Sequence, residues 1–177
     1  MVEDEEVIQT VQEYSKRQIF ERVPQGSEVI DRYQESWLRF AEEEEGMSVK
    51  EERLSRFTTK HIQAEVQKRF GTRDVDIEKK VGGASDLAFD LWNNTKRTAF
   101  EICLGAIKNE FEKDILKGIL DRDTTRLVIL YREYATGTQG KIYGHKWFEH
   151  PAQREMMDRA GIFKLEVEPI SLLGPVP

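Results

Sequence analysis

The sequence predicts an α/β fold in which a mixed sheet is flanked by helices, with a helical extension in front of it. Three segments of residues 1–70 space their apolar side chains three and four positions apart, whereas residues 74–104 alternate apolar and polar side chains. Residues 1–50 carry 13 acidic and 6 basic side chains, while residues 51–177 carry 20 acidic and 21 basic ones. We therefore expect an acidic helical extension over residues 1–47 and an α/β domain over residues 48–177.

The first predicted elements are all helices. Helical spacing covers residues 3–22 and 27–40, and the acidic run at 42–45 is typical of a solvated helix end. Ser48 with Glu51 three residues later matches a capping box, which predicts the start of a third helix.

A meander of three strands is expected after the third helix, which ends near residue 70. Residues 74–81, 86–91 and 99–104 each alternate apolar and polar side chains, the pattern of a strand with two different faces. Turn-forming residues at 93–96 join the second strand to the third.

The remaining pattern completes the α/β order. Residues 107–122 return to helical spacing, and residues 126–131 form the most apolar strand, which favours a central place in the sheet. Residues 134–144 are loop-like, 152–159 are typical of a short helix, and 162–167 are expected to form the last strand.

Composition excludes some classes of protein. The net charge of −6 argues against a surface that binds nucleic acid all over, although the near-neutral residues 51–177 could still form a local basic cleft. A single cysteine cannot form an internal disulfide, and no run approaches the roughly 18 apolar residues of a membrane span. With an acidic start and no leader pattern, we expect a cytoplasmic protein without a membrane partner.

Two short motifs carry the candidate chemistry. Residues 82–87 read GGASDL, a glycine pair followed by an aspartate at the start of the second strand, and residues 99–103 read AFEIC in the third strand. Together with the order of elements over 48–131, they resemble the PD-(D/E)XK nuclease superfamily of restriction endonucleases and Holliday junction resolvases. The resemblance covers about half of the chain and implies a restriction endonuclease-like αβββαβ core.

Strand alternation independently brings the two motif carboxylates together. We expect the turn to be centred on Asn94 and Thr95, so that Asp86 lies opposite Cys103. Asp86 and Glu101 are then diagonal neighbours on one face of the sheet. Two close carboxylates repel unless a cation lies between them, and Mg²⁺ prefers such oxygen ligands.

The resemblance extends this site. It implies a Mg²⁺ ion, or Mn²⁺ as a substitute, held by Asp86, Glu101 and the backbone carbonyl of Ile102, and it assigns a further acidic role to Glu65 on the preceding helix. It also implies DNA as the substrate and a homodimer as the working form.

The lysine that follows the second carboxylate in this family is missing. Cys103 occupies its position, and a thiol cannot replace an ammonium group; Cys103 is better interpreted as a small buried residue. Lys80, on the same alternation as the polar side chains of its strand, is the expected substitute. Lys79 replaces it if a bulge near Gly82 exchanges the two, and Lys108 is a further alternative.

Three functions remain open on these grounds. The first is a divalent-metal-dependent DNA endonuclease in which Glu65, Asp86, Glu101 and Lys80 are catalytic. The second is a catalytically degenerate member that binds nucleic acid or protein. The third is a structural or regulatory partner that pairs through the acidic helices of residues 1–45. The aromatic and basic residues 143–148 could either stack on a nucleic acid or pack against the core.

Overall fold

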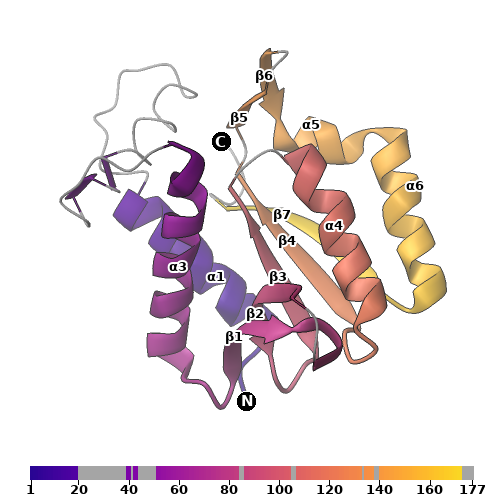
Figure 1. Ribbon diagram of the computed structural model, residues 1–177, viewed down its shortest axis with the longest axis horizontal. Coiled ribbons are helices and arrows are strands. Elements are labelled where there is room, and N and C mark those ends of the chain that lie inside the picture. The colour runs from indigo at the N-terminus through magenta and orange to yellow at the C-terminus, as the bar shows by residue number, and fades with distance from the viewer. Residues whose placement is uncertain are drawn as a thin grey trace.

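The computed structural model describes residues 1–19, 39–40, 42–43, 51–83, 86–104, 107–132, 134–137 and 140–172. Within them the chain forms an α/β fold whose open, mixed, five-stranded sheet lies between two layers of helices (Figure 1). Most of the helix predicted over 27–40, half of the acidic run at 42–45 and Ser48 of the expected capping box lie outside the described residues. No described helix combines the length and the apolar character needed to cross a membrane.

Among the described residues, the helices and strands follow the expected order as far as β4. The helical elements are α1 (Asp4–Tyr14), a π-helical turn η1 (Ser15–Ile19), α3 (Glu51–Phe70), the 3-10 turn η3 (Val81–Gly83), α4 (Ile107–Leu120), α5 (Gly144–Glu149), α6 (Pro151–Ala160) and the 3-10 turn η4 (Gly161–Phe163). The strands are β1 (Val75–Lys80), β2 (Ala88–Asn93), β3 (Thr98–Cys103), β4 (Arg126–Tyr131), β5 (Tyr134–Gly137), β6 (Gly140–Tyr143) and β7 (Glu166–Ser171).

The main sheet has the strand order β1-β2-β3-β4-β7. The first three strands form an antiparallel meander, whereas β3, β4 and β7 run parallel to one another. Helix α4 is the crossover that connects β3 to β4, as parallel neighbours require. Strand β4 is an interior strand, in agreement with its apolar sequence.

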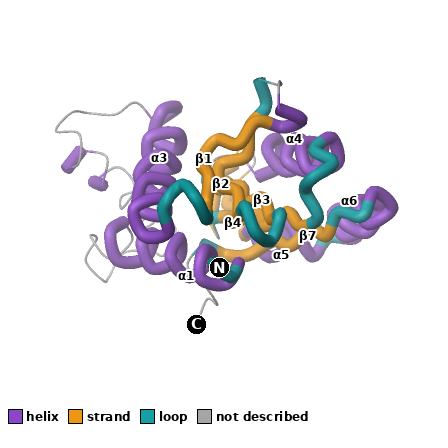
Figure 2. The backbone as a smooth tube through the Cα atoms, turned by 90° about the horizontal axis from the view of Figure 1, so that it is seen from below, coloured by secondary structure: helices purple, strands orange, loops and turns teal. Residues whose placement is uncertain are grey.

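Helices cover both faces of the sheet, and two separate cores result (Figures 1 and 2). On one face α1 and α3 pack against side chains that include Phe100 and Ile102 of β3. On the other face α4, α5 and α6 pack against side chains that include Ala99 and Cys103. The first helix of the predicted extension therefore shares a core with the α/β domain, and successive β3 residues face opposite layers.

The predicted register between β2 and β3 is wrong by two residues. Leu91 lies opposite Phe100 and Asn93 lies opposite Thr98, so the connection is the four-residue turn 94–97. The side-chain oxygen of Asn93 accepts hydrogen bonds from the amides of residues 95 and 96, and Arg97 closes the turn with a φ of 59°. This side-chain cap stabilises a longer turn than the expected one.

Two further expectations are corrected after β4. The segment 134–144, expected to be a loop, contains the two-stranded antiparallel hairpin β5–β6. The last strand begins at Glu166 rather than at residue 162, because α6 continues into the η4 turn and Lys164 adopts a left-handed φ of 62°. The apolar pair Ile162 and Phe163 therefore lies exposed in the η4 turn and not in a strand.

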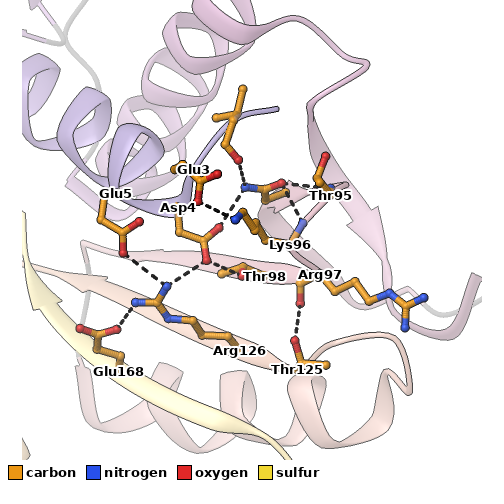
Figure 3. Close-up of polar contacts among 12 residues, drawn as sticks. Glu3, Asp4, Glu5, Thr95, Lys96, Arg97, Thr98, Thr125, Arg126 and Glu168 are labelled. Atoms are coloured by element: carbon orange, nitrogen blue, oxygen red, sulfur yellow. Dashed lines mark hydrogen bonds and ion pairs between the residues drawn. The ribbon is translucent and has the colours of Figure 1, made fainter.

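A buried carboxylate fastens the N-terminal helix to the sheet (Figure 3). Asp4, in the first turn of α1, accepts hydrogen bonds from Asn93 Nδ2 at 2.9 Å, Thr98 Oγ1 at 2.7 Å and Arg126 Nη1 at 2.9 Å. Arg126 also pairs with Glu168 of β7. One side chain thus connects α1 to β2, β3 and β4, which brings the N-terminal segment into the fold of the domain.

We predict that Asp4→Ala lowers the free energy of unfolding by about 2–3 kcal/mol, because three donors at a partly or fully buried position lose their acceptor. The matched control is Glu5→Ala, since Glu5 is 65% exposed and lies 3.7 Å from Arg126. We expect that control to change stability by less than about 0.5 kcal/mol. Urea denaturation of both variants measures the difference, and equal effects would contradict the assignment.

Candidate active site

Glu101 lies at the centre of the candidate site. It occupies the middle of β3, a strand in which every residue is buried, and its side chain is 6% exposed. Because it shares the alternation of Ala99 and Cys103, it faces the α4 layer. A charged group in this position needs a partner that also lies inside the protein.

That partner is Lys117, which comes from α4. Its ammonium group contacts Glu101 Oε1, lies 2.9 Å from Asp114 Oδ1 and donates to the carbonyl oxygen of Ala88 at 3.2 Å. An ammonium group has three donors, and these three acceptors account for all of them. The side chain is as buried as that of Glu101, at 6% exposure.

Asp90 supplies the second strand carboxylate. In the observed register it lies opposite Glu101, and its Oδ2 accepts a hydrogen bond from the backbone amide of Ile102 at 2.8 Å. Its carbonyl oxygen accepts from Gln63 Nε2 of α3, also at 2.8 Å. Burial raises the pKa of Asp90 from 3.8 to about 6, although the bond from Ile102 and the charge of Lys117 oppose the rise.

The site contains more carboxylates than ammonium groups. Burial, and then the charges of Asp90 and Asp114, raise the pKa of Glu101 well above its ordinary value, against the effect of Lys117. Burial also raises the pKa values of Asp114 and Glu110. Burial alone would lower the pKa of Lys117, but Glu101 and Asp114 raise it above its ordinary value. The cluster therefore has a deficit of positive charge inside the protein.

The strand carboxylates of this site match the oxygen ligands that a divalent cation prefers. Asp90 and Glu101 offer hard carboxylate oxygens from adjacent strands, and a 2+ charge would relieve the repulsion that raises their pKa values. The residues present therefore fit Mg²⁺ or Mn²⁺ in charge and ligand type. Among the described residues, no three His, Cys, Asp or Glu side chains form a ready-made metal site, so this pair would rely on backbone oxygen or water for its other ligands.

The other predicted site residues do not join this cluster. Asp86 is exposed at a bend ahead of β2, and Lys80 is exposed at the end of β1, opposite Ala88. Glu65 is half-buried on α3, where it pairs with Lys68 at 4.0 Å. The charges that act most strongly on Glu101 belong instead to three other residues, namely Asp90, Asp114 and Lys117.

The alternative lysines of the sequence analysis also have other positions. Lys79 faces the α4 layer, because Glu78 interrupts the alternation of β1 with a φ of 51°. Its ammonium group lies 2.8 Å from Asp121 Oδ2 and 3.2 Å from the centre of the Trp92 ring. Lys79 therefore belongs to a separate ion pair with Asp121. Lys108 lies in the first turn of α4, and its side chain is outside the described set.

Cys103 and the aromatic segment 143–148 have structural contacts. Cys103 is 2% exposed, as expected for a small buried residue, and its thiol lies 3.4 Å from Asp114 Oδ2. Burial and then the Asp114 charge raise its pKa, so the thiol stays neutral. Phe148 is buried against Phe111 and Tyr131, which favours the packing interpretation of that residue.

Three residues of the cluster, Asp90, Asp114 and Lys117, were not among the site residues predicted from the sequence. For Lys117 a signal existed: Asp114 and Lys117 stand on the helix face that also carries Phe111 and Ile115, where charges are unexpected. For Asp90 the signal was its alternation, but the wrong register moved it toward the turn.

The chain has no match in three comparisons with known proteins: no family model, no curated protein and no solved structure is similar to it. The geometry of the site is therefore the basis for its interpretation.

We predict that the metal-free protein loses stability as the pH rises from 4 to 8. Between the ordinary pKa of 3.8 and about 6, the folded state retains the Asp90 proton that the unfolded state has already released. Above pH 6 the folded state carries a buried charge, so its free energy of unfolding is lower by about 3 kcal/mol than near pH 4.

The variant Asp90→Asn removes this contribution and keeps an oxygen acceptor for the Ile102 amide. We expect it to be more stable than the parent by about 1–3 kcal/mol at pH 8, and to approach the parent near pH 4.5. Urea denaturation at both pH values, with a chelator present, measures the difference. A variant that is less stable than the parent at pH 8 would show that the ionised carboxylate is favourable.

Proposed function

We propose that this chain is a divalent-metal-dependent endonuclease that hydrolyses DNA phosphodiester bonds. Its catalytic site would be formed by Asp90, Glu101 and Lys117. The observation that carries the proposal is the contact of the Lys117 ammonium group with Glu101, next to the Asp90 carboxylate, on which the charge of Lys117 also acts. Phosphodiester hydrolysis needs these two components, a carboxylate pair for a metal ion and a fixed positive charge for the phosphate. DNA as the substrate class comes from the resemblance of the second and third strands to PD-(D/E)XK nucleases.

The metal ion would be held by the carboxylates of Asp90 and Glu101, with Mg²⁺ or Mn²⁺ as the matching ions. The resemblance adds the carbonyl oxygen of Ile102, the residue whose amide already bonds Asp90. When bound, such an ion lowers the pKa of a coordinated water and stabilises negative charge on the phosphate.

Lys117 has a charge role in this reaction and not a proton-accepting one. Because Glu101 and Asp114 raise its pKa, it remains an ammonium group at neutral pH and cannot take a proton from water. It can donate hydrogen bonds to the attacking water or to a phosphate oxygen, where it opposes the charge that develops during attack. Asp114 fixes its position from one helical turn away.

A catalytically inactive, binding-only protein is the second candidate. The burial of the Glu101–Lys117 ion pair favours this candidate, since each of the two side chains is only 6% exposed. In that case the carboxylates and Lys117 stabilise the sheet and helix as a buried network, and the protein would bind nucleic acid or another protein through its surface.

The resemblance also implies a homodimer, which we include in the proposal. Leu116 and Leu120 lie one turn apart on α4 with about half of each side chain exposed, at 50% and 53%. A second copy of the chain would remove this apolar surface from water.

The test is a cleavage assay with Mg²⁺ or Mn²⁺ on duplex, single-stranded and branched DNA, with RNA in parallel. We expect Asp90→Asn, Glu101→Gln and Lys117→Met each to reduce the cleavage rate by at least about 100-fold. Glu112→Gln is the matched control, because Glu112 is an exposed carboxylate on the same helix as Lys117.

Asp86→Asn and Lys80→Met separate the two site assignments. Loss of cleavage in these variants, with full activity in Asp90→Asn and Lys117→Met, would return the site to the residues predicted from the sequence. DNA binding without cleavage under every metal condition would favour the binding-only candidate.

A further inference from the structure

The ammonium group of Lys117 occupies the position of a counter-ion in this cluster. It contacts a carboxylate of β3, a carboxylate of its own helix and a backbone carbonyl at the start of β2. Lys79, which also faces the α4 layer, is paired with Asp121 instead. The stabilising charge that reaches Glu101 therefore comes from Lys117.

The carboxylate of Glu101 would have to serve Lys117 and a metal ion at the same time, through its second oxygen or through a shared Oε1. Oε1 already contacts the ammonium group, and the side chain lies in an interior where charges are weakly screened. A divalent cation that binds Glu101 and Asp90 would meet a positive charge at contact distance from one of its ligands. Metal binding and the Glu101–Lys117 ion pair therefore exclude or weaken each other.

Two of the contacts of Lys117 do not involve Glu101. Asp114 lies one turn earlier on α4, and its Oδ1 is 2.9 Å from the ammonium group independently of the contact with Glu101. The carbonyl oxygen of Ala88 is a further acceptor at 3.2 Å. An ammonium group released from Glu101 would therefore remain next to the metal ligands and would not move into solvent.

From these contacts we propose that Lys117 is a built-in counter-ion that competes with the divalent metal for Glu101, and that Asp114 is the positioning residue that retains it when the metal binds. This inference rests on the proposed function, since it needs a metal at Asp90 and Glu101. It adds that the metal-free site is held closed by the chain's own cation, and that metal loading releases Lys117 toward the phosphate.

The experiment measures Mn²⁺ binding to the metal-free full chain by isothermal titration calorimetry at one pH and one ionic strength, without DNA. We expect Lys117→Met to bind Mn²⁺ at least tenfold more tightly than the parent, because the competing ammonium is gone. Lys113→Met is the matched control: it removes the same formal charge from the exposed face of the same helix, and we expect less than a twofold change. Glu101→Gln should abolish Mn²⁺ binding both in the parent and in the Lys117→Met variant.

Circular dichroism first establishes that each variant is folded, and Lys117→Gln, which keeps hydrogen-bonding capacity, replaces Lys117→Met if the latter is unfolded. Equal affinity in the parent and in the Lys117 variant overturns the inference while leaving the metal site in place. An equal gain in the Lys113 variant also overturns it, because the effect would be one of general charge. No Mn²⁺ binding by the parent or by any variant removes the metal site, and the proposed function with it.

Discussion

The site and its surroundings depend on the burial of three carboxylates with one ammonium group between the sheet and α4. Removing one partner of a buried ion pair costs about 3–5 kcal/mol, so the position of Lys117 fixes how α4 lies on the sheet. The same constraint explains why charged residues stand on the inner face of that helix, between Phe111 and Gly118. The carboxylate of Asp90 accepts the amide of Ile102, so the second strand brings a further carboxylate next to the third.

Helices packed on both faces of the sheet hold the strands that carry this cluster. The core under α1 and α3 is built from apolar side chains, and the ion pair of Asp4 with Arg126 fastens α1 at the start of β4. Gln63 reaches from that layer to the carbonyl of Asp90, which connects the two sides through one backbone position. Both faces of the sheet thus have apolar cores, while the α4 side also buries Glu101 and Asp114 with Lys117.

Local sequence pattern predicted the fold well and the site incompletely, for physical reasons. Periodicity is a property of neighbouring residues, and it located α3, the three-strand meander, α4 and β4 within a few residues. The register of β2 on β3 depends on the cap that Asn93 provides, and an alternation pattern does not encode that cap. A register shift of two residues keeps Glu101 on the same face of the sheet but changes the residue of β2 that lies opposite it. Lys117 lies sixteen positions from Glu101 and meets it only through the packing of α4, so its role required the tertiary structure.

Cys103 and Lys117 are best understood as a compensating pair. In the family that the strands resemble, the residue two positions after the second carboxylate is a lysine, and position 103 does face the α4 layer as that lysine would. A lysine there would bring a second ammonium group to Asp114, which the thiol of Cys103 already contacts at 3.4 Å. The smaller, neutral cysteine leaves Asp114 free to hold Lys117. Under the proposed function, the positive charge would come from a helix rather than from the strand, and because that helix is a separate element, the charge could leave Glu101 without any movement of the strand that carries the carboxylate.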